Sequence, residues 1–347
     1  MSAPALSRPE VSVITIFRDA EQFLAEAVES VRRQTFAGWE LLLVDDGSQD
    51  GSSAIARDCA SADPARVRYL MHPGRAARGT GASRNLGMCA ARGECIAFLD
   101  ADDLFLPERL AHHRALLATV PAPAVVIGSE LYWRSWDGSV GPGLDHRQRV
   151  GVPDGARFAP PALLTLMLEP ELAWAPGICS VTFHAAPRNA LPLVPESFVS
   201  HAEDLCLVGA LLADRTALVT DACLARYRQH PGSTTARARA RGEYDLHGNH
   251  PDDYRYLRWL ERRLASDGQL IPELERALRA RLAPVEHPLR ATLGALPRAG
   301  VRAVFEALRA LLPVPLVDSA AARYRVRREG ARRTRISERC ARSEDAR

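Results

Sequence analysis

Short apolar runs alternate with amphipathic segments over the first 130 residues. A continuous run rich in Val, Ile and Leu is typical of a buried strand, whereas apolar residues that recur every three or four positions are typical of a helix. This pattern predicts five strands, at residues 11–17, 40–44, 67–71, 95–99 and 124–128. It predicts helices between them, at residues 23–31, 52–62 and 82–92, and a further helix that begins at Pro107. Because strands and helices alternate, we predict an α/β fold with a single, mainly parallel sheet flanked by helices on both faces.

The second part of the chain has a different pattern. Residues 135–200 are rich in Pro and Gly and are predicted to be irregular, and such a long loop-rich stretch is usually functional or an insertion. Further along, we expect a helix at 203–213, a strand within 217–226, a helical pair at 254–282 and an amphipathic helix at 301–312. The last residues are polar and rich in Arg. We therefore divide the chain into a domain at 1–235, a helical C-terminal region at 236–322, and a tail at 323–347 that is expected to be disordered.

The composition excludes several kinds of chemistry. The sequence contains no Lys, so its 45 basic residues are all Arg. This excludes Schiff-base catalysis, a Walker-type phosphate loop and a Tyr/Lys catalytic pair. The net charge of +3 is too small to indicate a nucleic-acid partner. The seven cysteines are scattered without a Cys-x-x-Cys pair, which argues against a zinc site and is typical of reduced thiols.

The reduced thiols predict a cytoplasmic protein, and the distribution of apolar residues predicts that it can at most lie on a membrane surface. Residues 1–10 lack the apolar core of a signal peptide, and no run approaches the roughly 20 apolar residues that a membrane span needs. Residues 301–312, followed by seven Arg between 323 and 335, are a candidate contact with an anionic membrane surface. Peripheral association with the inner face of the cell membrane is therefore one expectation, and a solvated basic tail is the alternative.

An acidic turn, Asp100-Ala101-Asp102-Asp103, directly follows the fourth predicted strand. Three carboxylates at one strand end repel each other unless a cation lies among them. Mg²⁺ and Mn²⁺ prefer oxygen ligands, often one or two carboxylates together with phosphate oxygens. The turn therefore predicts a divalent metal site, and the alternative is that Asp102 or Asp103 caps the helix near Pro107.

A second acidic turn, Asp45-Asp46-Gly47-Ser48, follows the second predicted strand. A carboxylate at this position can accept a hydrogen bond from a nucleotide base or ribose, although Asp, Gly and Ser also favour turns for purely local reasons. In parallel sheets, ligands bind beyond the carboxyl ends of the strands. Two acidic turns at such ends therefore indicate a ligand site at one edge of the sheet.

The segment Gly79–Gly87 allows two interpretations. Its Thr-Gly-Ala-Ser-Arg stretch is similar to the dinucleotide loop of short-chain dehydrogenases. Against that interpretation, Asn85 replaces the central glycine, the segment lies about 80 residues from the first residue, and a Tyr-x-x-x-Lys pair cannot exist without Lys. We favour a helix N-terminus whose Arg84 faces phosphate groups, with a solvated arginine as the alternative.

Two later segments carry candidate catalytic groups. His201-Ala202-Glu203-Asp204 stands at a predicted helix start, where a carboxylate is either favoured by the helix dipole or is the general base for an acceptor hydroxyl. Tyr227–Ser233 follows the last core strand and contains His230. That histidine is a candidate metal ligand or phosphate contact, although a single histidine is more often structural.

Taken together, these segments resemble the family 2 glycosyltransferases of the GT-A fold over about residues 9–235. The matching segments, in chain order, are Val11–Ile14 with Asp19–Glu21, Gln34–Phe36 with Leu43–Ser48, Ala82–Asn85, Gly93–Glu94 with Phe98–Asp103, Glu203–Asp204, and Tyr227–Ser233. The sequence departs from the family at Ile16–Asp19, where Pro-x-Tyr-Asn is usual, and at Leu205–Val208, which lacks the usual aromatic residue and Arg. The first departure affects the local turn and the expected base contacts, and the second affects the acceptor pocket.

The resemblance implies a metal-dependent, inverting transfer of a sugar from a nucleotide-diphosphate sugar to a hydroxyl acceptor. The acceptor would be a glycan or a lipid-linked sugar, in the synthesis of cell-surface polysaccharide or glycoconjugate, and the cation would be Mn²⁺ or Mg²⁺. The implied binding residues are Thr15 and Asp46 at the base, Arg84 at the nucleotide or diphosphate, and Asp100 near the ribose or metal. The implied metal-centre residues are Asp102 as the direct ligand and His230 near the metal-bound diphosphate. The implied catalytic residues are Asp204 as the general base and Glu203 beside it.

Three other classes of protein remain as alternatives. A nucleotidyltransferase that makes sugar nucleotides would also use an α/β sheet and Mg²⁺, but it needs a Gly-rich loop after the first strand, where Ile16–Asp19 has no Gly. A non-catalytic nucleotide-sugar-binding protein would lose the base, whereas Asp204 is present. An interaction protein would act through its C-terminal part, and salt-sensitive liposome binding would identify it.

Overall fold

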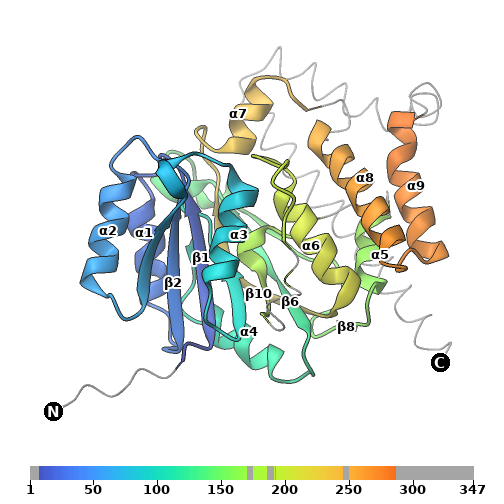
Figure 1. Ribbon diagram of the computed structural model, residues 1–347, viewed down its shortest axis with the longest axis horizontal. Coiled ribbons are helices and arrows are strands. Elements are labelled where there is room, and N and C mark those ends of the chain that lie inside the picture. Colours follow the sequence, from blue (N-terminus) through green and yellow to red (C-terminus); the bar gives the residue numbers. More distant parts are fainter. Residues whose placement is uncertain (1–7, 170–174, 186–190, 192, 245–249, 287–347) are drawn as a thin grey trace.

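The computed structural model describes residues 8–169, 175–185, 191, 193–244 and 250–286. Their strands form one sheet, in the order β3-β2-β1-β4-β9-β6-β10-β5, with β7 and β8 pairing at β6 and β10. Figure 1 shows this sheet with helices on both faces. The predicted α/β class is confirmed.

The first half of the sheet is parallel. Its strands are β1 (Val11–Phe17), β2 (Trp39–Asp45), β3 (Val67–Met71) and β4 (Cys95–Phe98). The helices between them are α1 (Leu24–Arg32), α2 (Ser52–Ala62) and α3 (Thr80–Ala90), with a short η1 (Pro73–Arg75) before α3. These elements confirm the predicted strands and helices to within three residues at each end.

Side chains of β1 alternate between two apolar layers. Val13 and Phe17 pack in the cluster that contains Val28 of α1, whereas Ile14 and Ile16 pack in the cluster that contains Met88 of α3. A continuous apolar strand is expected when both faces of a sheet are covered. Helix α3 approaches β1 closely because residue 87 is glycine, where a Cβ would lie 2.4 Å from Ile14 Cγ2. This contact fixes the position of α3, which carries Arg84.

The second half of the sheet is mixed. Strand β9 (Val181–His184) is antiparallel and lies between β4 and β6 (Ala124–Trp133). Strand β10 (Thr216–Arg228) runs parallel to β6, and the short β5 (Leu104–Phe105), β7 (His146–Gln148) and β8 (Arg157–Phe158) pair at their edges. The flanking helices are α4 (Arg109–Leu117), α5 (Ala162–Leu168) and α6 (Glu203–Asp214), with short η2 (Ser135–Asp137), η3 (Pro142–Leu144) and η4 (Ile178–Ser180).

Two expectations about this half were wrong. The strand predicted to end at residue 128 continues to Trp133, because β7 and the second half of β10 pair with residues 130–133. The segment 135–200 was expected to be irregular, but it contributes three strands and α5. Those strands have two to four residues, which is too short for a recognisable apolar alternation.

The C-terminal helices pack onto the same core. They are α7 (Thr234–Ala240), α8 (Pro251–Ser266) and α9 (Pro272–Glu286), and the last two confirm the predicted helical pair. Leu260 of α8 and Leu278 of α9 are fully buried in the cluster that contains Leu211 of α6, and Figure 1 shows α8 and α9 beside α5 and α6. The predicted boundary between residues 235 and 236 falls inside α7.

Two further expectations lie outside the described residues: the amphipathic helix at 301–312 and the tail at 323–347. Among the residues that the structure describes, none of the helices combines the length and the apolar character that crossing a membrane requires.

Candidate active site

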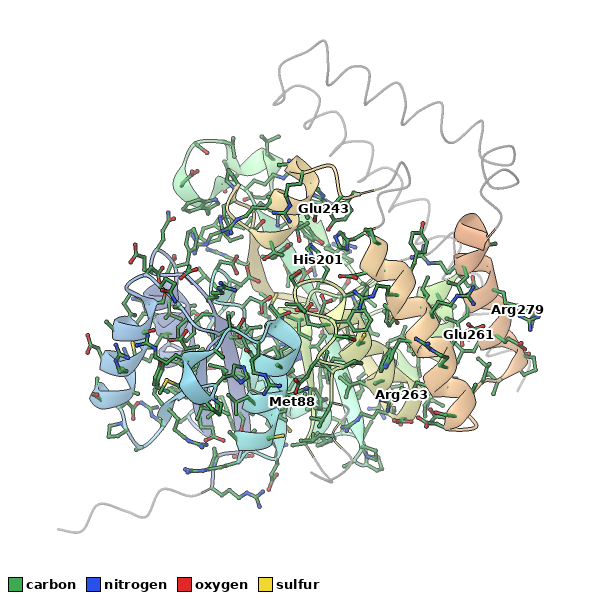
Figure 2. All side chains as sticks on the ribbon, turned by 45° about the horizontal axis from the view of Figure 1, so that its top comes forward. Met88, His201, Glu243, Glu261, Arg263 and Arg279 are labelled. Atoms are coloured by element: carbon green, nitrogen blue, oxygen red, sulfur yellow. The ribbon has the colours of Figure 1, made fainter. Side chains whose placement is uncertain are left out.

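The Arg84 side chain joins three distant segments of the chain. Its Nη2 donates to Asp100 Oδ1 at 3.0 Å and lies 3.4 Å from Glu203 Oε1. The guanidinium also lies 5.2 Å from the centre of the Phe98 ring, and the side chain is 4% exposed. Helix α3, the acidic turn after β4 and the start of α6 therefore meet at Arg84. Figure 2 labels Met88 of α3 and His201 of the loop before α6.

The carboxylates around Arg84 share an unusual electrostatic environment. Burial raises the pKa of Asp100, Glu203 and Asp204, and at each of them the Arg84 guanidinium opposes the rise. Asp204 also raises the pKa of Glu203, because two like charges on adjacent residues disfavour ionisation. The group therefore combines one buried and two partly buried acids with one cation, an arrangement that is common at catalytic sites.

The backbone before α6 is held in an uncommon conformation. Ala202 has φ of 61°, in the left-handed region, and directly precedes Glu203. Such a conformation costs a non-glycine residue about 1–3 kcal/mol and tends to occur where function requires it. Glu203 and Asp204 then form the first turn of α6, where Asp204 Oδ1 accepts the Leu205 N–H at 2.8 Å. The loop thus places both carboxylates at a helix N-terminus, where negative charge is favourable.

The end of β10 lies against the acidic turn. His230 Nε2 is 3.0 Å from Asp102 Oδ2, and the side chains are 11% and 28% exposed. Asp103 Oδ1 accepts the backbone N–H of Arg228 at 2.9 Å, and burial, with its two acidic neighbours, raises the pKa of Asp103 well above its ordinary value. Helix α4 begins at Arg109 without a side-chain cap, so neither carboxylate has the capping role considered as an alternative.

Arg228 is a functional candidate that the sequence did not identify. Its Nε donates to the Asp102 carbonyl oxygen at 2.7 Å, and its Nη2 donates to Glu26 Oε2 at 2.6 Å. Its guanidinium carbon lies 4.8–4.9 Å from the ring centres of three aromatic residues: Phe23, Trp133 and Trp136. These contacts fix the turn that carries Asp102. The only sequence signal for Arg228 was its place in the Tyr227–Ser233 segment. Its contacts could not be predicted, because the aromatic residues come from distant segments.

Asp46 holds the loop before α3. Its carboxylate accepts the backbone N–H groups of Arg78 at 2.7 Å and Gly79 at 3.0 Å, and the Ser83 hydroxyl at 3.1 Å. Thr15 is 1% exposed and lies on β1 on the face shared with Val13, opposite to the face covered by α3. The structure thus connects Asp46 to the helix that carries Arg84 and places Thr15 on the other face. Base contacts by Asp46 and Thr15 stay a prediction.

Glu130 is a second residue that the sequence did not identify. It lies on β6, is 2% exposed, and its Oε2 accepts the Cys179 thiol at 3.3 Å. Burial raises its pKa to about 7, and the nearby charges of Asp204 and Asp100 contribute to the rise. Its Oε1 has no hydrogen-bond partner among the residues that the structure describes. The available signal in the sequence was a carboxylate two residues after an apolar run. Because the predicted strand ended at Gly128, Glu130 was not placed in the sheet.

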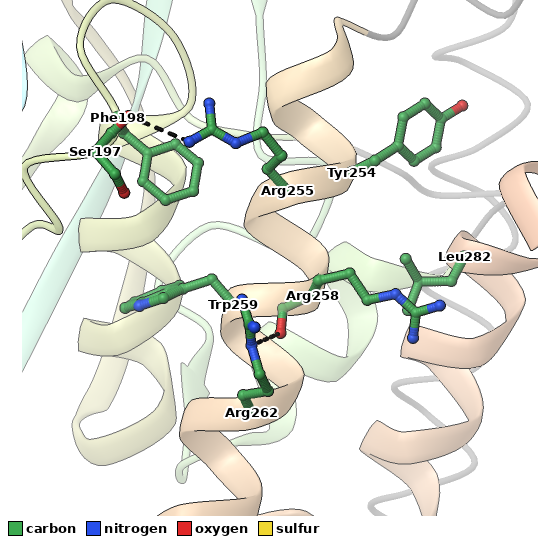
Figure 3. Close-up of a pocket in the computed structure, with 8 residues that line it drawn as sticks. All are labelled: Ser197, Phe198, Tyr254, Arg255, Arg258, Trp259, Arg262 and Leu282. Atoms are coloured by element: carbon green, nitrogen blue, oxygen red, sulfur yellow. Dashed lines mark hydrogen bonds between the residues drawn. The ribbon is translucent and has the colours of Figure 1, made fainter.

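A separate pocket of about 310 Å³ lies between α8 and the loop before α6 (Figure 3). Its lining combines aromatic side chains with arginines: Phe198, Tyr254 and Trp259 with Arg255, Arg258 and Arg262. None of its lining residues belongs to the group around Arg84.

The first part of the chain is similar in sequence to known glycosyltransferases. Residues 12–139 match the family model described as Glycosyl transferase family 2. The uncharacterized glycosyltransferase EpsJ of Bacillus subtilis is 43% identical over 95 residues, 27% of this chain and 26% of that protein. The O-antigen biosynthesis protein RfbC of Myxococcus xanthus is 38% identical over 127 residues, 35% of this chain and 10% of that protein. The matched segments span only 26–39% of the length of three such curated relatives.

Solved structures share the fold over a longer part of the chain. Staphylococcus aureus TarS 1–349 in complex with UDP-GlcNAc has a TM-score of 0.57 and 17% identity, over 96% of this chain and 92% of that one. The mannosyltransferase PcManGT of Pyrobaculum calidifontis, in complex with GDP-Man and Mn²⁺, has a TM-score of 0.56 and 18% identity, over 95% and 84%. Residues 12–139 are therefore similar to glycosyltransferase family 2, and the fold of the chain is the α/β fold of the GT-A type.

Proposed function

We propose that the protein transfers a sugar from a nucleotide-diphosphate sugar to a hydroxyl acceptor, with inversion at the anomeric carbon. The observation that carries this proposal is the position of Arg84, which contacts both Asp100 and Glu203. Through it, the acidic turn that would lie at the donor diphosphate is adjacent to the Glu203–Asp204 pair that would receive the acceptor proton. A sugar transfer needs both functions within one site.

Structural relatives support the class of donor. TarS is solved with UDP and with UDP-GlcNAc, and PcManGT with GDP-Man. In this protein the Nε and Nη1 atoms of Arg84 are buried and have no hydrogen-bond partner in the described part of the chain. Guanidinium N–H groups suit phosphate oxygens, so we assign Arg84 to the diphosphate side of the donor.

The residues of the acidic turn fit a divalent cation. Asp102 and His230 would hold it, because their side chains already meet at 3.0 Å while the Asp102 carboxylate remains partly exposed. Asp100 would lie nearby, with 31% of its side chain exposed. A carboxylate with an imidazole suits Mn²⁺ and Mg²⁺ if phosphate oxygens and water complete the shell. The cation would supply Lewis-acid stabilisation of the leaving nucleoside diphosphate.

We assign Asp204 as the general base. Its carboxylate would accept the proton of the acceptor hydroxyl while the hydroxyl oxygen bonds to the anomeric carbon, and the bond from that carbon to the diphosphate would break. A single displacement inverts the anomeric configuration. The raised pKa of Asp204 brings its basicity closer to neutral pH, which improves general-base catalysis. Glu203 would orient the site through its contact with Arg84.

The wider role follows from the resemblance and remains a proposal. One relative is named for O-antigen biosynthesis, and we propose synthesis of cell-surface polysaccharide or glycoconjugate, with a glycan or lipid-linked sugar as acceptor. We propose a cytoplasmic location with peripheral membrane contact through the Arg-rich segment at 323–335. Liposome binding that falls with salt and is lost on truncation at about residue 318 would support this contact.

A panel of nucleotide-sugars tests the function directly. The protein is incubated with Mn²⁺ and each donor, and both the thermal shift and the slow release of nucleoside diphosphate are measured. We expect one donor class to give both signals. Binding without release for every donor, with and without candidate acceptors, would instead identify a nucleotide-sugar-binding protein.

A further inference from the structure

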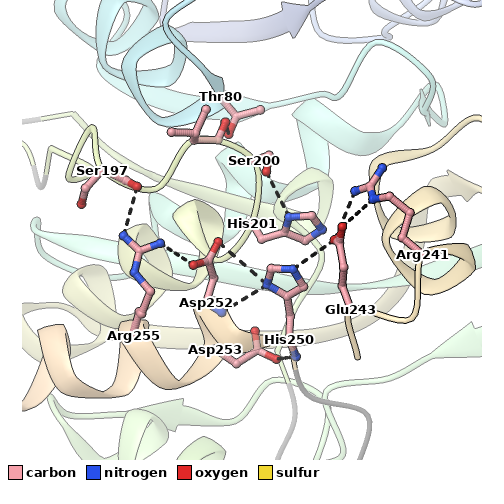
Figure 4. Close-up of polar contacts among 11 residues, drawn as sticks. Thr80, Ser197, Ser200, His201, Arg241, Glu243, His250, Asp252, Asp253 and Arg255 are labelled. Atoms are coloured by element: carbon pink, nitrogen blue, oxygen red, sulfur yellow. Dashed lines mark hydrogen bonds and ion pairs between the residues drawn. The ribbon is translucent and has the colours of Figure 1, made fainter. Parts of the chain in front are cut away.

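Two histidines and an aspartate meet between the loop before α6 and the N-terminus of α8. His201 comes from the loop before α6, His250 is the N-cap of α8, and Asp252 lies in the first turn of α8 (Figure 4). Each of the three offers one ligand atom, and these atoms lie within 4.8 Å of one another. The two imidazole rings are stacked at 4.0 Å with an interplanar angle of 12°.

The hydrogen bonds of these residues leave capacity for a ligand. His201 Nδ1 is 3.1 Å from the Ser200 hydroxyl, but its Nε2 is buried and has no hydrogen-bond partner among the described residues. A buried imidazole nitrogen without a partner is costly in the absence of a ligand. His250 Nε2 faces Glu243 Oε2 at 3.5 Å, so a fourth candidate ligand borders the cluster.

The chemistry of the three side chains also suits a metal ion. Imidazole nitrogen is a usual ligand of transition metals, and the two histidines offer one nitrogen each. A carboxylate beside them adds the negative charge that such a cation needs.

We propose that His201, His250 and Asp252 form a site for one transition-metal ion of the zinc type, with Glu243 or water as the fourth ligand. Imidazole nitrogen with carboxylate oxygen is a usual ligand set for Zn²⁺. The imidazole rings must turn out of their stack for their lone pairs to converge on one ion. The scattered cysteines argued against a zinc site in the sequence, but this site uses none of them.

The site is distinct from the centre at Asp102 and His230. Its ligands join α8 to the loop before α6, and His201 is two residues before Glu203. An ion bound here would fix the left-handed Ala202 and the position of the Glu203–Asp204 turn. The role that follows is structural: the ion stabilises the loop, and it does so whether or not the protein transfers sugars.

Cobalt spectroscopy tests the proposal without any measurement of activity. The full chain without an affinity tag is freed of metal with a chelator and titrated with Co²⁺, whose visible absorption is strong in four-coordinate sites. We expect one equivalent to give this absorption, Zn²⁺ to displace it, and Zn²⁺ to raise the melting temperature. Absence of the absorption together with no Zn²⁺-dependent rise in melting temperature would overturn the proposal.

Variants assign the ion to these residues. His250→Asn keeps an N-cap acceptor for α8 while removing the imidazole, and Asp252→Asn keeps the backbone N–H that His250 Nδ1 accepts. We expect each of these variants, and His201→Asn, to weaken Co²⁺ binding at least ~100-fold. Even the residues that hydrogen-bond to a metal ligand change metal affinity by ~10–100-fold.

The control variants are His112→Asn, a histidine on α4 that contacts Thr220, and Asp102→Asn. We expect both to keep the cobalt spectrum. Loss of the spectrum only in Asp102→Asn would assign the ion to the other centre and overturn the proposal, as would unchanged binding in all three ligand variants. Melting curves of the metal-free variants establish that each one is folded.

Discussion

His230 Nε2 lies 3.0 Å from Asp102 Oδ2, so the end of β10 meets the acidic turn that follows β4. The two residues are far apart in sequence, and the contact exists because β10 crosses to the same edge of the sheet. Arg228, two residues earlier, binds the carbonyl oxygen of Asp102 and fixes the turn from the other side. Together these contacts place one carboxylate beside one imidazole, as the proposed cation site requires.

We predict that His230→Gln lowers the apparent affinity of the enzyme for Mn²⁺ more than it lowers the maximal rate. Loss of the imidazole should raise the Mn²⁺ concentration for half-maximal transfer at least ~10-fold, because even outer contacts of a metal ligand contribute ~10–100-fold. The measurement is the initial rate of transfer against Mn²⁺ concentration. His112→Gln, on α4, is the matched control. An unchanged Mn²⁺ requirement would remove His230 from the metal centre.

We predict that Asp204→Asn lowers turnover by ~10²–10⁴-fold, the usual contribution of a general base. The amide keeps the size of the side chain and can still accept the Leu205 N–H, so donor affinity should change little. Single-turnover rates and donor binding are measured on the same preparation. Near-full turnover in the variant would show that another group accepts the proton.

We predict that Arg84→Gln moves the acidic limb of the pH–rate profile to higher pH. A general base works only when deprotonated, so activity falls as the pH drops through its pKa. Burial raises the pKa of Asp204 and the Arg84 guanidinium opposes the rise, so removing that cation raises the pKa further. The measurement is kcat/KM from about pH 5 to 9 for both proteins. A limb at the same pH in the variant would contradict the electrostatic role of Arg84.

We predict that Glu130→Gln stabilises the protein at alkaline pH and has little effect at acidic pH. Burial raises the pKa of Glu130 to about 7, so the folded state resists its ionisation. The wild type therefore loses stability as the pH rises from the ordinary pKa of a glutamate to about 7, and the penalty is complete above that pH. One pKa unit corresponds to about 1.4 kcal/mol, so the full penalty is about 3 kcal/mol.

Denaturant unfolding at pH 5 and pH 8 measures this effect. The free energy of unfolding of the variant should exceed that of the wild type by much more at pH 8 than at pH 5. Glu29→Gln, which removes an exposed ion pair with Arg33, is the control and should change little at either pH. Equal differences at both pH values would mean that Glu130 is not neutral in the folded protein.

The sequence predicted the first half of the fold well because its elements are long and locally patterned. Strands such as Val11–Phe17 are continuous apolar runs, and helix α3 follows from the spacing after Gly79. Strand β9 could not be predicted, because four residues form a strand only through their pairing with β4 and β6. The same holds for the strands at 146–148 and 157–158.

The candidate site was predictable only in part, for a related reason. The carboxyl ends of parallel strands lie at one edge of a sheet, so the sequence predicted Asp46 and Asp100 at the same edge. The contacts of Arg84 with Glu203 and of Arg228 with three aromatic rings join segments that no local pattern connects. Likewise, His201 and His250 are separated by the whole of α6, β10 and α7.

The most direct test of the account is the release of nucleoside diphosphate from nucleotide-sugars by the wild type and by Asp102→Asn, each with Mn²⁺ and with chelator. We expect that the wild type turns over one donor class with Mn²⁺, that the chelator abolishes the reaction, and that the variant stays inactive at any Mn²⁺ concentration. Equal release by the variant, or release that continues in chelator, would contradict the assignment of a metal-dependent sugar transfer to this edge of the sheet.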